Sequence, residues 1–277
     1  MPQAPNRNPQ NRVPNESIEA LIAQGRVAFG CGRLHHIWSP AARQQLLRRA
    51  IDGGLRRLDV APSYGNGLCE RAIGQALKST RDDVRVNTKV GIPVSLYPPV
   101  ADWTFPVFRA VDLLSRNHQR AYMRRDFRPC TLRASLEGSL RRLGISRIDT
   151  YFLHEPKVML SRTEWDEVLV TMLELHSEGK IRAWGLAGPC RHFDLAALRS
   201  DLPFVLQTPF AELDSSPAPL VHERLAFGLY SAFGAQPSPG SFAEFIGSSA
   251  ERFPDASFIV STTDAARLTG WVAGGRA

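Results

Sequence analysis

The stretch LDVAPSYGNG, from Leu58 to Gly67, ends an apolar run with an acid and continues into a turn rich in Pro, Ser, Gly and Asn. Asp59 closes the run, and Tyr64 follows five residues later in the turn. An apolar run that stops at such a cluster of turn residues predicts a buried strand followed by a loop. Where helices join parallel strands, functional side chains gather at the carboxyl ends of the strands. The stretch therefore predicts a strand of a parallel sheet with an acid and a phenol at its functional end.

Short apolar runs alternate with helical patterns along the rest of the chain. Eight runs predict strands, at residues 26–30, 55–60, 84–89, 148–154, 181–186, 204–208, 226–231 and 256–260. A strand followed by a helix, repeated eight times, predicts a single-domain α/β fold, the (β/α)8 TIM barrel, which commonly occupies roughly 250 residues. The alternative is an open doubly wound sheet. That fold usually has a turn with three glycines after its first strand, and neither GCGRLHH nor GNGLCE supplies the third glycine.

Helices are predicted between these strands from end signals and from apolar spacing. Ser39 and the proline after it begin one helix, and Gly54 ends it. Leu132 and Leu136 belong to a leucine series at helical spacing in another. The predicted helices span residues 39–54, 69–78, 131–144, 163–180, 193–199, 217–225, 242–252 and 264–271.

The two ends of the chain and one long connection complete the predicted organisation. Residues 1–20 are rich in Pro, Asn and Gln and predict a flexible tail, so the barrel is expected to span residues 21–277. The long loop at residues 90–130 follows the third strand, and in a barrel such a loop is expected to hang over the active face. The chain ends soon after its last predicted helix.

Composition narrows the classes of function. The chain has 34 basic and 27 acidic residues, a formal net charge of +7, which suits an anionic ligand or a phosphorylated cofactor. It carries no helix-turn-helix, zinc-finger or aromatic RNA-binding signature, so no nucleic-acid partner is predicted. Apolar runs stay below the roughly 18 residues that a membrane span needs. The four cysteines form no CxxC pair, which predicts no metal site, no disulfide scaffold and a reducing cytoplasm.

Three ionisable residues end consecutive predicted strands: Asp59 the second, Lys89 the third and His154 the fourth. Tyr64 lies in the loop after the second strand, and in a barrel all four side chains could meet on one face. A nearby ammonium lowers the pKa of a phenol, and a carboxylate can hold that ammonium in place. A histidine can hydrogen-bond a substrate oxygen. The set predicts a site that protonates a carbonyl oxygen as hydride arrives at carbon, or removes an alcohol proton in reverse.

Three segments together resemble the signatures of the aldo-keto reductase superfamily: LDVAPSYGNGLCERAIGQAL, VNTKVG and SLEGSLRRLGISRIDTYFLHEP. EGKIRAWGLAG is similar to the helix and strand that follow, and the resemblance extends from about Ala28 to Arg267. It implies a (β/α)8 barrel, NADP(H) and a small-molecule carbonyl or alcohol substrate. It also implies that Tyr64 is the proton donor, that Asp59 and Lys89 tune it, and that His154 orients the carbonyl.

The same resemblance implies a set of cofactor-binding residues. Gln207 would bind the nicotinamide carboxamide, and Tyr230 would stack on the nicotinamide ring. Ser231 and Phe233 would line the pyrophosphate. Thr262 and Arg267 would lie near the adenosine 2′-phosphate, where an arginine favours NADP(H), with NAD(H) as the alternative.

The chain departs from the family at several of these positions. Ala187 and Gly188 stand where the family usually has a Ser-Asn pair that contacts the carboxamide. Ser261 stands in place of a lysine for the phosphate, and Trp271 in place of an asparagine for the adenine. The family usually also has a C-terminal loop that walls the substrate pocket, and the short C-terminal end lacks it. These departures predict weak nucleotide binding or an open pocket, over which a partner chain could supply a wall.

Substrate contacts are predicted from aromatic residues in loops. Trp38 follows the first strand and Trp103 lies in the long loop, and both suit stacking on a sugar or aromatic ring. Arg124 and Arg125 could attract an anionic substrate, but the preferred interpretation is a solvated basic face.

Two functions other than a carbonyl reductase stay open. The first is a nucleotide-sensing or partner-binding subunit with little turnover. The second is a lyase or isomerase that uses the tyrosine and lysine to abstract a proton next to a carbonyl. All three would use the same fold, and the chain could act as a monomer or a homo-oligomer.

Overall fold

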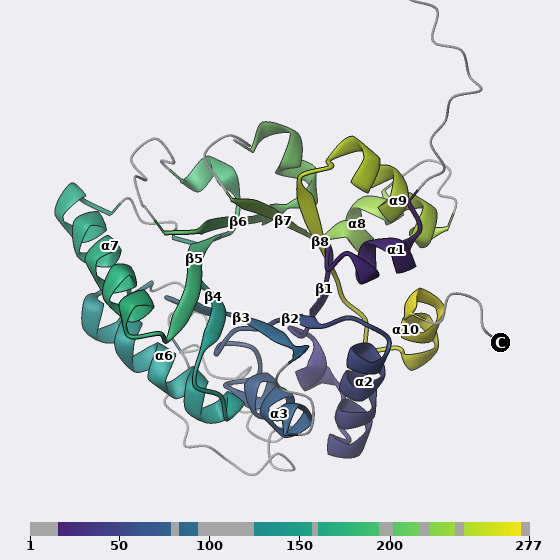
Figure 1. Cartoon of the computed structure of the whole chain (residues 1–277), viewed down its shortest axis with the longest axis horizontal. Helices are drawn as coiled ribbons and strands as arrows, with labels where there is room; N and C mark the ends of the chain where they lie inside the picture. Colours follow the sequence, from purple (N-terminus) through teal and green to yellow (C-terminus); the bar gives the residue numbers. More distant parts are fainter. Residues whose placement is uncertain are drawn as a thin grey trace, which may run out of the picture.

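The computed structural model describes residues 16–78, 83–93, 125–156, 160–193, 202–216, 222–235 and 241–272. Eight parallel strands pair in chain order and close into a barrel (Figure 1). The strands are β1 (Val27–Gly30), β2 (Arg57–Asp59), β3 (Arg85–Val90), β4 (Ile148–His154), β5 (Ile181–Ala187), β6 (Phe204–Pro209), β7 (Glu223–Phe227) and β8 (Ala256–Val260). The prediction of a (β/α)8 barrel is confirmed, and the open sheet is wrong because β1 pairs with β8.

Helices surround the barrel on its outside (Figure 1). Serine side chains cap several of them; Ser161 and Ser241 each form a reciprocal capping box with a glutamate three residues later. The helices are α1 (Ile18–Ala23), α2 (Pro40–Asp52), α3 (Leu68–Leu77), α6 (Pro129–Leu143), α7 (Arg162–Ser177), α8 (Leu229–Gly234), α9 (Phe242–Arg252) and α10 (Ala265–Val272). The described residues also form the short 3-10 helices η1 (Leu34–His36), η3 (Cys190–His192) and η5 (Phe210–Ser215).

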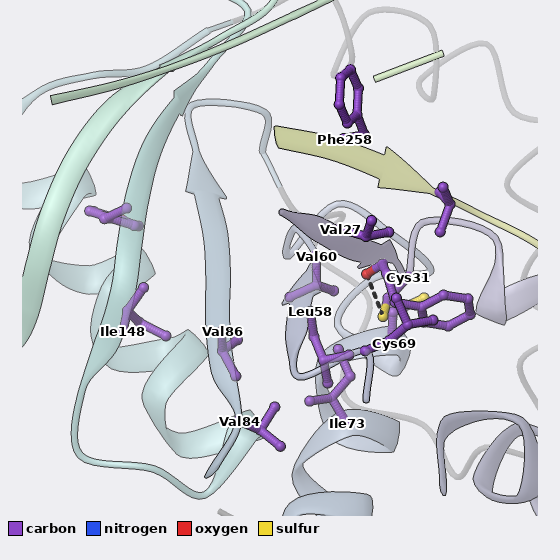
Figure 2. Close-up of a cluster of buried hydrophobic side chains, with 14 of the residues drawn as sticks. Val27, Cys31, Leu58, Val60, Cys69, Ile73, Val84, Val86, Ile148 and Phe258 are labelled. Atoms are coloured by element: carbon purple, nitrogen blue, oxygen red, sulfur yellow. Dashed lines mark hydrogen bonds between the residues drawn. The ribbon is translucent and has the colours of Figure 1, made fainter. Parts of the chain in front are cut away.

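The strands contribute to two apolar cores, one formed by their outward-facing side chains and one by their inward-facing side chains. The outer core packs strands against helices; Figure 2 shows Leu58, Val86 and Phe258 from three strands with Ile73 of α3. A smaller core combines Phe152 of β4 with six other buried residues, two of them from β5 and one each from β1, β6, β7 and β8. Because successive side chains of a strand point to opposite faces, the outward Leu58 leaves its neighbour Asp59 on the inner side. This alternation carries polar side chains into the barrel.

A buried carboxylate ties the elements around β3 together. Glu70 in α3 is fully buried and accepts hydrogen bonds from Thr88 Oγ1 at 2.8 Å and from Arg142 Nε at 2.6 Å. Thr88 belongs to β3 and Arg142 to α6. Removing one partner of such a buried pair is costly, since the other charge then lacks compensation. Glu70 thus fixes the strand that carries Lys89.

Three sequence predictions about element boundaries are wrong. The seventh strand ends at Phe227 instead of Ser231, because Gly228 adopts a left-handed φ of 79° and α8 begins directly after it. Residues 223–225 are strand rather than helix. The predicted tail also reaches too far, since α1 begins at Ile18 after a Ser17 cap and buries Leu21. Residues 1–15 of that tail, most of the 90–130 loop, and residues 194–199 of one predicted helix lie outside the described residues.

Gly185 provides a test of the inner packing. A Cβ atom at this position of β5 would overlap the backbone oxygen of Val205 and lie 2.9 Å from Phe152 Cε1. We expect Gly185→Ala to lower the free energy of unfolding by about 1–3 kcal/mol, as measured by urea denaturation. Gly234→Ala is the matched control, because a Cβ atom there meets nothing within 4 Å. Equal urea midpoints for the two variants would contradict the close approach of β5 and β6.

Candidate active site

The four predicted catalytic side chains line one cavity of about 270 Å³. Asp59 is the last residue of β2, Lys89 lies at the end of β3 and His154 is the last residue of β4. Tyr64 reaches the same cavity from the turn after β2. Closure of the barrel brings the carboxyl ends of these neighbouring strands together, which explains why residues far apart in sequence meet here.

Lys89 forms the central hydrogen bonds among the side chains of the cavity. Its side chain is buried, and its Nζ lies 2.6 Å from Asp59 Oδ2 and 3.1 Å from the carbonyl oxygen of Val60. It also lies 5.2 Å from the centre of the Tyr64 ring. Burial lowers the pKa of Lys89, but the charges of Asp59 and Tyr64 and hydrogen bonds to both raise it above its usual value. Lys89 is therefore a cation at neutral pH, in contact with the phenol.

Gln207 joins this network from the other side of the barrel. Its Nε2 donates to Asp59 Oδ1 at 3.0 Å, so both carboxylate oxygens of Asp59 are engaged. Gln207 Oε1 is buried and has no hydrogen-bond partner within the described part of the chain. A buried acceptor without a partner costs free energy, and this side chain lines the cavity. The cavity wall is thus prepared for a ligand that donates a hydrogen bond, such as a carboxamide NH₂ group.

His154 is held in its neutral form. Burial lowers its pKa well below the ordinary value, and the positive charges of Lys89 and Arg125 lower it further. Its ring meets the ring of Tyr64 edge to face, with centroids 5.9 Å apart. A neutral imidazole has one N–H donor, so His154 can donate a hydrogen bond to a substrate oxygen beside the tyrosine without carrying charge.

The turn that carries Tyr64 needs residues that accept left-handed backbone angles. Gly65, Asn66 and Gly67 have φ values of 61°, 50° and 81°, which glycine adopts freely and asparagine tolerates. Tyr64 N–H donates to the oxygen of Ala61 at 3.0 Å and closes the turn. A Cβ atom at Gly65 would also lie 2.6 Å from His35 Cβ. The Gly and Asn residues of this stretch therefore set the position of the phenol.

The structure places the predicted cofactor residues in two groups. Gln207 lines the cavity, as do the altered positions Ala187, Gly188 and Ser261. Tyr230, Ser231 and Phe233 belong to α8 and do not line it.

Tyr230 packs instead against Phe242, with ring centroids 5.0 Å apart, and the Arg267 guanidinium lies 4.8 Å from its centre. Phe227, at the end of β7, lines the cavity in place of Tyr230. The earlier end of β7 accounts for this difference of three residues. The alternation of Leu225 and Phe227 along a strand that stops at Gly228 is the sequence signal for it.

The remaining predicted residues lie at the edge of the barrel or outside the described residues. Thr262 is buried, and its Oγ1 accepts a hydrogen bond from the backbone of Asp264 at 3.0 Å. Trp271 is buried against Phe242 and does not line the cavity. Trp38 is 78% exposed and also does not line it. Trp103 lies outside the described residues.

Arg125 and Glu155 were not recognised in the sequence as a pair. Arg125 Nη2 lies 3.0 Å from Glu155 Oε2, and the arginine side chain is only 3% exposed. The interpretation of this arginine as part of a solvated face is therefore wrong, while Arg124 lies outside the described residues. Glu155 lines the cavity directly after His154. Its position beside the predicted histidine was the available signal.

The cysteines near the site are buried thiols. Burial raises the pKa of Cys69 to about 12, and Cys69 Sγ lies 3.9 Å from His35 Nδ1. Cys31 lies in the same cluster, and burial raises its pKa well above the usual value (Figure 2). Within the described ranges, no group of three His, Cys, Asp or Glu side chains is arranged to hold a metal ion. Every helix in those ranges is too short or too polar to span a bilayer.

The model of the Aldo/keto reductase family matches residues 26–207 of the chain, which is more than half of its length. The three signature segments lie within this match, as do Asp59, Lys89 and His154 of the cavity. The chain belongs to the aldo/keto reductase family.

Individual relatives agree with this assignment. D-threo-aldose 1-dehydrogenase from Pseudomonas sp is 33% identical over 175 residues, which cover 60% of this chain and 50% of that protein. NADH-specific methylglyoxal reductase from Escherichia coli (strain K12) is 36% identical over 139 residues, covering 48% and 37%. The chain thus spans about half the length, or less, of these curated relatives. The solved holo form of an aldo-keto reductase from Bacillus halodurans shares the fold, with a TM-score of 0.65 and 18% identity over 91% of this chain and 87% of that one.

The neutral state of His154 makes stability depend on pH. Its pKa in the folded protein lies well below 6.5, the value of an exposed histidine in the unfolded chain. Between the folded pKa and about 6.5, the unfolded chain binds more protons, so the free energy of unfolding decreases as the pH falls. Between pH 6 and pH 5, we expect the free energy of unfolding of the wild type to fall by about 1.4 kcal/mol per pH unit more than that of His154→Asn. Urea unfolding at several pH values measures it.

The control for this experiment is His192→Asn, a substitution at an exposed histidine of η3. This variant should keep the wild-type slope. If His154→Asn also keeps the wild-type slope, the buried imidazole is not held neutral.

Proposed function

We propose that this protein is an oxidoreductase that reduces the carbonyl group of an aldehyde, ketone or sugar to an alcohol, or runs the reverse reaction, with NADP(H) as coenzyme. The observation that carries the proposal is the contact of the buried Lys89 ammonium with both Asp59 and Tyr64 in one cavity. A cation beside a phenol favours the phenolate and makes the phenol a stronger acid. A proton donor that works near neutral pH needs this property.

Each residue of the cavity has a definite role in this proposal. Tyr64 donates a proton to the carbonyl oxygen and becomes a phenolate, whose negative charge Lys89 stabilises. Asp59 keeps Lys89 charged and in place through the 2.6 Å ion pair. His154 donates a hydrogen bond to the same carbonyl oxygen in its neutral form. In the oxidation direction, the phenolate accepts the proton of the alcohol.

The residues around the cavity fit the nicotinamide end of a dinucleotide. The unpartnered Oε1 of Gln207 would accept a hydrogen bond from the carboxamide, and the Phe227 ring would pack against the nicotinamide. A bound coenzyme of this kind would supply or accept the hydride at the carbonyl carbon. Arg267 is exposed on α10 and is available to a 2′-phosphate, which favours NADP(H).

The relatives suggest which carbonyl compounds to test. One bears the name of an aldose dehydrogenase and another that of a methylglyoxal reductase, so we propose small aldehydes and sugars as the substrate class. The second relative is named as NADH-specific, so NAD(H) remains the alternative coenzyme.

One observation favours a second candidate, a nucleotide-binding subunit with little turnover. Ala187 and Gly188 line the cavity and offer no side-chain donor or acceptor to a carboxamide. A Cβ atom at Gly188 would lie 3.3 Å from the Cα of Glu155, so the backbone of Glu155 is closely packed against this position. NADPH binding without turnover of any aldehyde or sugar would favour this candidate.

Tyr64→Phe tests the proposed proton donor. It removes the hydroxyl group and keeps the ring, so we expect kcat to fall by about a hundredfold or more while NADPH affinity and the melting temperature stay near wild type. NADPH oxidation with a panel of aldehydes measures the effect.

Tyr151→Phe is the matched control for Tyr64→Phe. It also loses a phenolic hydroxyl, one that donates to the oxygen of Leu132 at 2.9 Å, away from the cavity. This control should lose about 1 kcal/mol of stability and keep kcat. Wild-type turnover by Tyr64→Phe would show that another group gives the proton.

A second experiment decides which aromatic residue contacts the nucleotide. We expect Phe227→Ala to weaken NADPH binding by roughly tenfold, because the ring that faces the cavity is lost. Tyr230→Ala should change the affinity less, since Tyr230 packs on α9 and α10. Isothermal titration calorimetry measures both. The opposite order of effects would return the stacking role to Tyr230.

A further inference from the structure

Glu155 lines the cavity beside His154, yet no step of the proposed reaction uses it. Its backbone has a φ of 46°, a left-handed conformation that is uncommon for residues other than glycine. Such strain persists where the surrounding contacts enforce it and often marks functional sites. The Glu155 N–H donates to the oxygen of Ala187 at 2.6 Å, which fixes the residue against the neighbouring strand β5.

Arg125, whose side chain is buried, holds Glu155 through two further contacts. Arg125 Nη2 pairs with Glu155 Oε2 at 3.0 Å, and Arg125 Nε donates to the Glu155 backbone oxygen at 3.2 Å. The arginine side chain is 3% exposed, whereas that of Glu155 is 29% exposed. Glu155 lines the cavity and Arg125 does not, so a molecule in the cavity meets Glu155 before the guanidinium.

We propose that Glu155 selects the substrate: it accepts hydrogen bonds from hydroxyl groups next to the reacting carbonyl and disfavours substrates that carry a carboxylate. The inference rests on the proposed function and specifies its substrate class as neutral, hydroxylated carbonyl compounds. An ionised carboxylate is an acceptor without a donor, so substrate hydroxyl groups complement it. A substrate carboxylate meets a like charge in a partly desolvated cavity, where repulsion is stronger than in water.

The test compares three small aldehydes with the wild-type enzyme and Glu155→Gln. D-glyceraldehyde carries hydroxyl groups, propanal has the same carbon chain without them, and glyoxylate carries a carboxylate. The wild type should prefer D-glyceraldehyde to propanal by about tenfold in kcat/KM, as expected for hydrogen bonds to a charged group. Glu155→Gln should raise kcat/KM for glyoxylate by about tenfold relative to kcat/KM for propanal.

Two further variants keep the test decisive. Glu155→Asn removes the carboxylate, and asparagine tolerates the left-handed backbone conformation. It is therefore the variant to use if Glu155→Gln does not fold. Glu251→Gln is the charge-matched control, because this exposed glutamate of α9 lies outside the cavity. The control should keep the wild-type order of the three aldehydes.

The outcomes separate the inference from the proposed function. If the wild type turns over propanal and D-glyceraldehyde equally well and neither Glu155 variant gains activity with glyoxylate, the inference is wrong and the oxidoreductase assignment stands. If the wild type oxidises neither NADPH nor NADH with any of the three aldehydes or with a wider panel of sugars, the proposed function fails and the inference fails with it.

Discussion

The buried ion pair between Lys89 and Asp59 is the interaction on which the rest of the site depends. An ammonium enclosed in a barrel tends to lose its proton unless a carboxylate compensates for burial. The two residues come from neighbouring strands, and the register pairs Asp59 with Asn87, two residues before Lys89. Both side chains therefore face the interior of the barrel, with Lys89 two residues further along its strand than the partner of Asp59. The closed barrel thus places a charged lysine beside Tyr64, as the proposed proton donor requires.

Much of the fold could be predicted because its signals are local. The strands β4 and β8 and the helix α9 have the predicted bounds, since apolar spacing and serine caps depend only on neighbouring residues. The seventh strand was misplaced because AFGLYS is one apolar run in the sequence. Gly228, which has a left-handed backbone conformation, divides that run into a strand and a helix. The sequence pattern alone does not reveal the backbone angles of this one residue.

Some residues of the candidate site could also be located from the sequence, and others could not. Asp59, Lys89 and His154 could be located because each ends a strand, and barrel topology brings such ends together. Phe227 depends on where β7 stops. The pairing of Arg125 with Glu155 joins residues thirty positions apart, one of them preceding a helix and the other following a strand. Only the tertiary arrangement tells a paired arginine from a solvated one.

The charges around the cavity indicate how its chemistry is controlled. The chain as a whole carries +7, but the Lys89 ammonium is matched by Asp59 and the Arg125 guanidinium by Glu155. His154 is neutral because burial lowers its pKa, and the same two cations lower that pKa further. In this balanced environment, deprotonation of Tyr64 adds one negative charge, and the ammonium that stabilises it is already in place. Preorganised charge of this kind needs no rearrangement during the reaction and is therefore effective. Burial keeps the imidazole neutral and these cations reinforce the effect, so our proposal assigns the donated proton to Tyr64.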